Sequence, residues 1–135
     1  MKLEKINHLG VAVASLEEAL PYYRDVLGMS YQGTEEVAEQ KVRVAFLQIG
    51  ESKIELLEPT SADSPIAKFL EKNGSGIHHI AYQVENIAET LAGLEQKGVR
   101  LIDRIPRQGA HGTQIAFIHP KSTGGILTEI CEVDH

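Results

Sequence analysis

Tryptophan is absent from this chain of 135 residues, and aromatic residues make up only 5% of it. Leucine, isoleucine and valine must therefore fill most of its hydrophobic core. Cys131 is the only cysteine, which excludes an intrachain disulfide and a cysteine-based zinc site. The length, with 42% apolar and 24% charged residues, is that of an ordinary globular domain, so we predict a single domain over residues 1–135.

Basic residues are outnumbered, with 13 Lys and Arg against 19 Asp and Glu, and the formal net charge is −6. A chain this acidic has no general positive field for nucleic acid, so an anionic ligand needs a local basic cluster or backbone N–H groups. No apolar run approaches the roughly 18 residues of a membrane span, and residues 1–5 are too charged for the core of a signal peptide. We therefore predict a cytoplasmic protein that binds neither nucleic acid nor membrane.

The first half of the chain has the pattern of a βαβββ unit. A strand is predicted at residues 6–13, and a helix follows from Ser15 to the stop at Gly28. Ser15 with Glu18 has the pattern of a capping box. Three more strands are predicted, at about residues 31–37, 42–49 and 53–58.

The second half repeats this order. A strand follows Gly76, and Asn86 begins a helix that ends at Gly98, again with a glutamate three residues after the cap. Its further strands are predicted near residues 99–103, 113–119 and 125–131. The fold is therefore predicted to be α+β, with two βαβββ repeats at about residues 4–60 and 76–133. A short helix over residues 64–73, capped by Ser64 and started by Pro65, joins them.

One histidine and one glutamate occur at matching places in both repeats. His8 matches His79 in the first strand, and Glu55 matches Glu129 in the last. A lone strand histidine is usually structural, and a lone strand glutamate can simply face water. Their duplication instead predicts that the two repeats, related by a pseudo-two-fold axis, jointly hold one divalent ion. Two imidazoles and two carboxylates suit octahedral Mn, Fe, Co, Ni or Zn with two positions open for water or substrate.

The neighbouring polar residues receive other expectations. His78 precedes a ligand in a strand, so it must face the opposite way. Glu58 and Glu132 lie at odd offsets from the ligands and should also point away. His111 and His119 lie in a Gly- and Pro-rich region that could form a loop near the site.

Five short segments are similar to segments of the methylmalonyl-CoA epimerase family of the vicinal oxygen chelate superfamily. They are Asn7-His8-Leu9-Gly10-Val11-Ala12-Val13, Glu55-Leu56-Leu57-Glu58-Pro59, Asp63-Ser64-Pro65-Ile66-Ala67-Lys68-Phe69-Leu70, Gly76-Ile77-His78-His79-Ile80-Ala81 and His119-Pro120-Lys121. The resemblance covers essentially the whole chain. It implies βαβββ units paired into a half-barrel around a metal, the same four ligands (Glu55 is Gln in some members), and a homodimer.

The resemblance also implies a reaction, the interconversion of the two stereoisomers of methylmalonyl-CoA through proton removal at C2. In the family, Glu129 serves one face of that carbon. Some members have a second glutamate where this chain has Val44, so we predict Glu55 as the second acid/base. Lys121, Arg107 and Arg104 are candidate contacts for the phosphates of an acyl-CoA substrate.

Other members of the superfamily offer three alternatives, of which glyoxalase I and a binding protein remain open. Glyoxalase I also uses two His and two Glu, but similar glyoxalases have an Arg for glutathione where this chain has Ala12. The helix at residues 64–73 also favours the epimerase. An extradiol dioxygenase needs two His and one carboxylate only, and Glu55 would crowd its oxygen site. A non-enzymatic, resistance-type binding protein of the same fold needs no base beside the metal.

Overall fold

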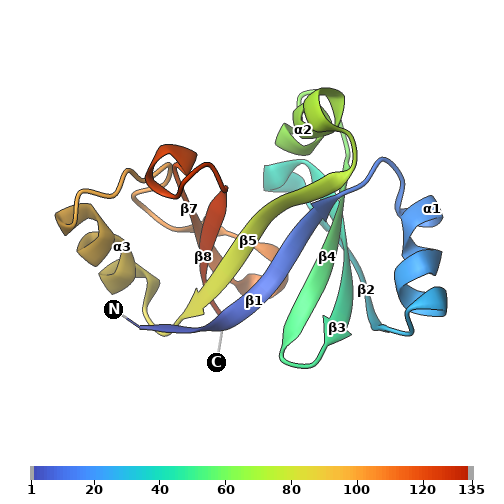
Figure 1. Cartoon of the computed structure of the whole chain (residues 1–135), viewed down its shortest axis with the longest axis horizontal. Helices are drawn as coiled ribbons and strands as arrows, with labels where there is room; N and C mark the ends of the chain where they lie inside the picture. The colour runs from blue at the N-terminus through green and yellow to red at the C-terminus, as the bar shows by residue number, and fades with distance from the viewer. Residues whose placement is uncertain (1, 134–135) are drawn as a thin grey trace. The chain divides into compact units, whose positions relative to one another are not determined.

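The computed structural model describes residues 2–133, and within that range it has three α-helices and eight β-strands (Figure 1). The chain divides into two compact units. The N-terminal unit comprises residues 8–78, and the C-terminal unit comprises residues 79–133 together with residues 2–7. No helix within the described range is long and apolar enough to cross a membrane.

The N-terminal unit has the predicted βαβββ order and then the linking helix. Its elements are β1 (Leu3–Ala12, of which residues 8–12 belong here), α1 (Leu16–Pro21), the π-helix η1 (Tyr22–Val26), β2 (Ser30–Val37), the 3-10 turn η2 (Ala38–Gln40), β3 (Val42–Ile49), β4 (Ser52–Pro59) and α2 (Pro65–Asn73). The strands lie side by side in the order β2-β3-β4-β1, with β1 parallel to β4 and the other pairs antiparallel. The predicted strands and both helix starts of this half are confirmed.

Helix α1 begins at its predicted cap, where Ser15 Oγ accepts a hydrogen bond from Glu18 N at 3.3 Å. It stays α-helical only as far as Pro21, which has no N–H to donate. The chain continues as η1, where Leu27 N donates to Tyr22 O at 2.9 Å, five residues back. The helix packs on one face of the sheet through buried Val13, Leu16, Ala45, Leu47 and Leu56.

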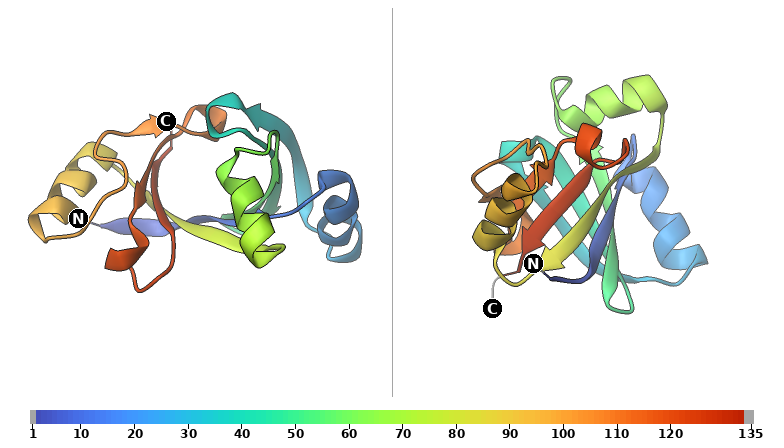
Figure 2. Two further views of the ribbon diagram at one scale, coloured as in Figure 1. Left: turned by 90° about the horizontal axis from the view of Figure 1, so that it is seen from above. Right: turned by 60° about the vertical axis from the view of Figure 1, so that its left-hand side comes forward.

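The C-terminal unit repeats the arrangement. Its elements are β5 (Gly76–Val84, of which residues 79–84 belong here), α3 (Ile87–Gln96), β6 (Arg107–Gln108), η3 (Ala110–Gly112), β7 (Gln114–Ile118), η4 (Pro120–Ser122) and β8 (Thr128–Glu132). The strand order is β5-β8-β7-β6, with β5 parallel to β8. Helix α3 covers one face of these strands (Figure 2). The core between them consists of Val84, Ile87, Leu91, Ala116, Ile118 and Ile130.

The predicted strand at residues 99–103 is wrong. Only Leu101 forms a β-bridge, to Ile118. Ile102 N and Asp103 N both donate to Phe117 O, and the Asp103 carboxylate accepts from Phe117 N at 2.9 Å. A side-chain oxygen thus replaces a strand carbonyl, so a regular ladder cannot continue. The short edge strand is β6 instead.

Each repeat has a glutamate that caps a helix from the neighbouring strand. Glu58 Oε2 accepts from Leu16 N at 3.4 Å, and Glu132 Oε1 accepts from Ile87 N at 2.9 Å. A carboxylate is favourable there because helix N-termini have unpaired N–H groups and positive dipole ends. Glu58 and Glu132 therefore point to the helix side of their sheets, as predicted.

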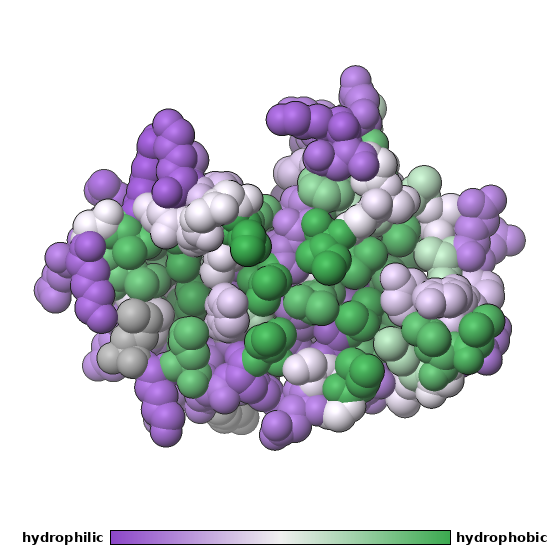
Figure 3. All heavy atoms as spheres, in the orientation of Figure 1, coloured by the Kyte–Doolittle hydropathy of each residue, from purple (hydrophilic) through white to green (hydrophobic). Residues whose placement is uncertain are grey.

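Apolar side chains are exposed on η1 and at the residue directly after it. Tyr22 is 54%, Val26 72% and Leu27 49% exposed, and green apolar atoms gather over this part of the molecule in Figure 3. Single exposed apolar side chains are ordinary on monomers, whereas groups of them often mark interfaces. The predicted homodimer stays a prediction.

Candidate functional site

His8 and Glu55 form a buried pair in the N-terminal unit. His8 lies on β1 and Glu55 on β4, where Gly10 is the register partner of Glu55. Because side chains alternate along a strand, both project from the face opposite the one that packs on α1. His8 Nδ1 lies 3.2 Å from Glu55 Oε2, and neither residue is more than 9% exposed.

His79 and Glu129 form the equivalent pair in the C-terminal unit. His79 lies on β5 and Glu129 on β8, where Ala81 is the register partner of Glu129. His79 Nε2 lies 3.3 Å from Glu129 Oε1, and both residues are buried. The strand register therefore puts one imidazole beside one carboxylate in each repeat, as the duplication predicted.

The spacing within each pair fits ligands of one metal ion. Two ligand atoms that lie about 2.1 Å from an ion, at right angles to each other, are about 3 Å apart. A buried carboxylate is costly unless a cation balances its charge. Each unit thus supplies half of the predicted ligand set with a spacing that is compatible with ligands of one divalent ion. The joining of the two pairs around one ion stays a prediction.

A phenylalanine flanks the paired glutamate in both repeats. Phe46 is the register partner of Glu55, and Phe117 is that of Glu129. The rings of Phe117 and His79 meet edge to face, with centroids 5.6 Å apart. Such rings keep water from the carboxylates and lower the local dielectric, which strengthens electrostatic interactions. Neither phenylalanine was predicted from the sequence, although each occupies the matching place in its repeat.

Arg107, predicted as a substrate contact, lies next to the pair of the C-terminal unit. Its guanidinium lies over the Phe117 ring at 5.5 Å, and that ring contacts His79. Arg107 Nε is 3.2 Å from Asp103 Oδ1, yet this buried nitrogen makes no hydrogen bond within the described residues. A half-exposed guanidinium held in this way is suited to an anionic oxygen.

The other sequence candidates lie in different surroundings. Arg104 is 79% exposed at its side chain and is paired with Glu95 at 3.1 Å. Lys121 is exposed on η4, where its backbone N–H donates to His119 Nδ1 at 3.1 Å. His119 is therefore a structural cap for this turn, while His111 lies in η3 with a left-handed backbone.

His78 has a structural contact of its own. Its ring meets Phe69 of α2 edge to face, with centroids 5.1 Å apart. Within the N-terminal unit, this contact joins the start of β5 to the linking helix. The prediction of a structural role for His78 is supported by this packing.

The loop after Arg107 depends on Gly109, and Gly109→Ala is expected to destabilise it. An added Cβ would lie 2.5 Å from Thr113 Oγ1 and 2.8 Å from Ile115 Cγ2. Thr113 cannot move freely because its hydroxyl donates to Ala110 O at 2.8 Å. Overpacking of this kind costs about 1–3 kcal/mol, which thermal or urea unfolding would measure.

The matched control is Gly93→Ala in α3, where a Cβ would meet nothing within 4 Å. Alanine in place of a helical glycine is expected to raise the free energy of unfolding by about 0.5–1 kcal/mol. Equal effects of the two substitutions would contradict the packing described at Gly109.

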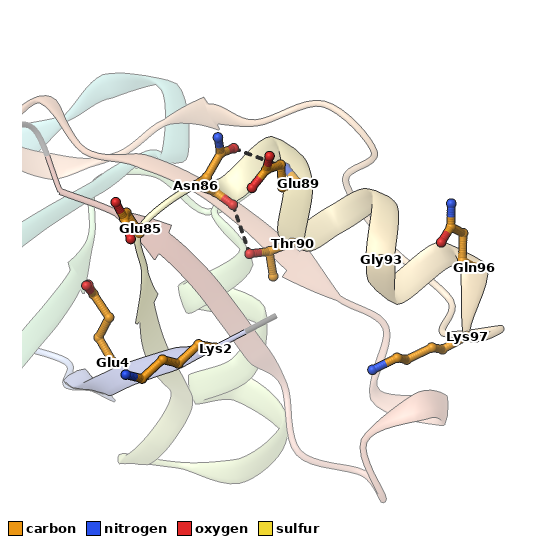
Figure 4. A pocket seen from close by; sticks show the side chains of 9 residues that line it. All are labelled: Lys2, Glu4, Glu85, Asn86, Glu89, Thr90, Gly93, Gln96 and Lys97. Atoms are coloured by element: carbon orange, nitrogen blue, oxygen red, sulfur yellow. Dashed lines mark hydrogen bonds between the residues drawn. The ribbon is translucent and has the colours of Figure 1, made fainter.

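A polar groove in the C-terminal unit is not the candidate site. It is lined by residues around the start of β1 and by residues from the turn before α3 to the end of that helix, among them Lys2, Glu4, Glu85, Glu89 and Lys97 (Figure 4). Its lining carries charges of both signs, and neither the histidine–glutamate pair nor Arg107 lines it. The groove is therefore separate from the histidine–glutamate pair.

The chain is similar in sequence to known proteins over nearly its whole length. The sequence profile of the Glyoxalase/Bleomycin resistance protein/Dioxygenase superfamily matches residues 7–117. The chain is 50% identical to the uncharacterized protein YqjC of Bacillus subtilis, over 96% of this chain and 93% of that protein. It is 41% identical to the ethylmalonyl-CoA/methylmalonyl-CoA epimerase of Cereibacter sphaeroides, over 96% of this chain and 98% of that enzyme.

A solved structure extends the likeness to the fold. A variant of Streptomyces coelicolor methylmalonyl-CoA epimerase in complex with 2-nitronate-propionyl-CoA superposes with a TM-score of 0.94 and 40% identity, covering 98% of this chain and 96% of that one. The predicted fold is thereby confirmed. The chain belongs to the glyoxalase/bleomycin resistance protein/dioxygenase superfamily, and within it to the methylmalonyl-CoA epimerase family.

Proposed function

We propose that this protein interconverts the two stereoisomers of methylmalonyl-CoA. The supporting observation is the buried histidine–glutamate pair on the same face of each repeat, in a chain about 40% identical to named epimerases over nearly its full length. The C2 hydrogen of this substrate lies between a thioester and a carboxylate, so its removal leaves a negative charge that neighbouring groups can stabilise.

We further propose that His8, Glu55, His79 and Glu129 together bind one divalent ion. The ion would be Co, Mn, Ni, Fe or Zn, since imidazole and carboxylate ligands accept all of these. When bound, it supplies a Lewis acid that withdraws charge from the thioester oxygen. The fit of each pair to cis ligand spacing supports this assignment.

Glu129 is the proposed acid/base on one face of C2. Its carboxylate is buried beside His79 and Phe117, so it is shielded from bulk solvent. Glu55 has the equivalent place in the other repeat. Its role as a second acid/base stays a prediction.

Arg107 is the proposed contact for an anionic oxygen of the substrate, either its carboxylate or a CoA phosphate. Its position over Phe117 supports this role, because one aromatic ring separates it from the ligand His79. Lys121, exposed on η4, is the second candidate for a phosphate. The cytoplasmic location and the homodimer are kept as predictions.

A stereochemical assay tests the function. One stereoisomer of methylmalonyl-CoA, incubated with the protein, is expected to give the equilibrium mixture of both, and a chelator is expected to stop the conversion. The glutathione adduct of methylglyoxal should be left unchanged, because Ala12 replaces the arginine expected of a glyoxalase. Chiral chromatography and absorbance measure the two reactions.

Turnover of the glutathione adduct with no change in methylmalonyl-CoA would replace the epimerase with glyoxalase I. Tight binding of ligands without any turnover would instead support a resistance-type binding protein. Ethylmalonyl-CoA provides a further arm of the assay, since the Cereibacter sphaeroides relative is named for both substrates.

A further inference from the structure

Inversion at C2 needs a proton to leave one face and another to arrive at the opposite face. Two acid/base groups on opposite sides are the simplest way to do this. In the N-terminal unit, Val44 on β3 is only 2% exposed and lies on the same face as Phe46, two residues along the strand. Valine cannot transfer a proton, so a second group must come from elsewhere on this face.

The strand register supplies one. Glu35 on β2 is the direct register partner of Val44. Partners in an antiparallel pair project from the same face, so Glu35 shares the face of Val44 and Phe46. Phe46 is in turn the partner of the ligand Glu55. Glu35 therefore lies on the sheet face that bears the His8–Glu55 pair.

The neighbouring glutamate lies on the other face. Glu36 is the partner of Arg43, and Arg43 Nη1 lies 3.4 Å from Glu58 Oε1, on the helix side of the sheet. Glu36 is exposed, whereas Glu35 is half-buried. Two adjacent carboxylates thus belong to different surroundings, and only Glu35 faces the ligand pair.

The strand register also separates Glu35 from Glu55. Strand β2 is two strand spacings from β4, roughly 10 Å, and Glu35 is level with Leu57, two residues along β4 from Glu55. Both carboxyl groups extend from the same face, so a small acyl group has room between them.

The C-terminal unit has an ionisable side chain at the equivalent place. There, Phe117 is the partner of Glu129, and Ile115, two residues earlier, is the partner of Arg107 on the edge strand β6. In the N-terminal unit, Phe46 is likewise the partner of Glu55, and Val44, two residues earlier, is the partner of Glu35. The two edge strands therefore present side chains of opposite charge, Glu35 and Arg107, at equivalent positions on the ligand face.

We propose that Glu35, in place of the Glu55 predicted from the sequence, is the acid/base that serves the face of C2 opposite to Glu129, and that Glu55 is a ligand only. This inference rests on the proposed epimerase function. Glu129 takes the proton as the C2–H bond breaks, and the electron pair is delocalised onto the thioester oxygen. Protonated Glu35 gives its proton to the other face, and that electron pair forms the new C2–H bond. Exchange with water returns both carboxyls to their starting states.

The test is Glu35→Gln, assayed with each stereoisomer separately in D₂O. Epimerisation is expected to fall at least about 100-fold, the usual contribution of a general acid or base. The isomer whose C2 hydrogen faces Glu129 should still exchange that hydrogen for deuterium with retention. The other isomer should not exchange. Mass spectrometry and chiral chromatography measure both outcomes, and elemental analysis should find the metal content of the wild type.

Two variants complete the design. Glu36→Gln, the adjacent carboxylate on the helix side, is expected to epimerise at the wild-type rate. Glu35→Gln combined with Val44→Glu moves the carboxylate one strand closer to Glu55 and should restore at least about tenfold of the lost rate by the same acid–base contribution. Thermal unfolding checks that the double variant is folded. If the double variant does not fold, Glu35→Gln and Glu36→Gln still test the assignment of Glu35.

Turnover by the wild-type protein tests the proposed epimerase function alone. A wrong epimerase function can therefore be distinguished from a wrong assignment of Glu35. If wild type epimerises and Glu35→Gln does so at the same rate, the assignment of Glu35 is wrong. It is also wrong if Glu35→Gln loses metal in proportion to activity. One-isomer exchange by metal-restored Glu55→Gln, together with normal rates for Glu35→Gln, would give the role to Glu55.

Discussion

His79→Ala is expected to lose bound metal, thermal stability and epimerisation together. His79 is one of the two buried residues proposed as metal ligands in the C-terminal unit, and its Nε2 lies 3.3 Å from Glu129 Oε1. An ion present at about a thousand times its dissociation constant stabilises the folded state by about 4 kcal/mol. Its loss should lower Tm by roughly 10 °C. His8→Ala should behave alike, because His8 has the same place beside Glu55.

Metal analysis by mass spectrometry and thermal melting with and without chelator measure these effects. His78→Ala is the matched control, since His78 is the adjacent histidine and packs on Phe69 away from the pair. It should keep its metal and its response to chelator. Full metal occupancy in purified His79→Ala would remove His79 from the ligand set.

Glu129→Gln is expected to abolish epimerisation even after metal is restored at high concentration. The loss should be at least about 100-fold, because glutamine can neither accept nor return a proton. The variant should still exchange the C2 hydrogen of one stereoisomer with deuterium, and it should be the isomer that Glu35→Gln leaves unchanged. Single-isomer incubation in D₂O measures this reciprocity.

Glu132→Gln is the control for this experiment. Glu132 lies three residues along the same strand and caps α3 through Ile87 N at 2.9 Å, on the other face. Glutamine keeps an oxygen that can accept this hydrogen bond but loses the negative charge, so the substitution should cost less than about 1 kcal/mol of stability and leave the reaction intact. A metal-loaded Glu129→Gln that epimerises at the normal rate would contradict the role of Glu129.

The parts of the fold that local chemistry determines could be predicted from the sequence. Ser15, Asn86 and Ser64 each accept a hydrogen bond at the predicted helix start. The repeated histidine and glutamate predicted both buried pairs, because matching positions in two repeats must have matching surroundings. The contact of His8 with Glu55 and of His79 with Glu129 depends on the parallel pairing of β1 with β4 and of β5 with β8.

Features that depend on contacts between strands could not be predicted in this way. The capping roles of Glu58 and Glu132 require a strand beside a helix distant in sequence. The strand predicted at residues 99–103 does not form because the Asp103 carboxylate accepts a hydrogen bond from the backbone N–H of Phe117.

The register of β2 against β3 could not be predicted from the sequence either. The pairing of β2 with β3 shifts between Tyr31 and Thr34. Alternation of apolar and polar residues alone does not locate such a shift, and a one-residue error would exchange the two faces of the strand. The partnership of Glu35 with Val44 therefore became visible only in the structure.

The two glutamates on β8 make this strand intolerant of single-residue insertions and deletions. Glu129 faces the proposed metal ligand His79, and Glu132, three residues later, caps α3 on the opposite face. Removal of one residue between them would turn both carboxylates to the same face. Either the histidine or the helix would then lose its partner, and β4 has the same constraint through Glu55 and Glu58. Length variation among homologous chains should therefore be confined to the loops, while both strands keep the spacing Glu-x-x-Glu.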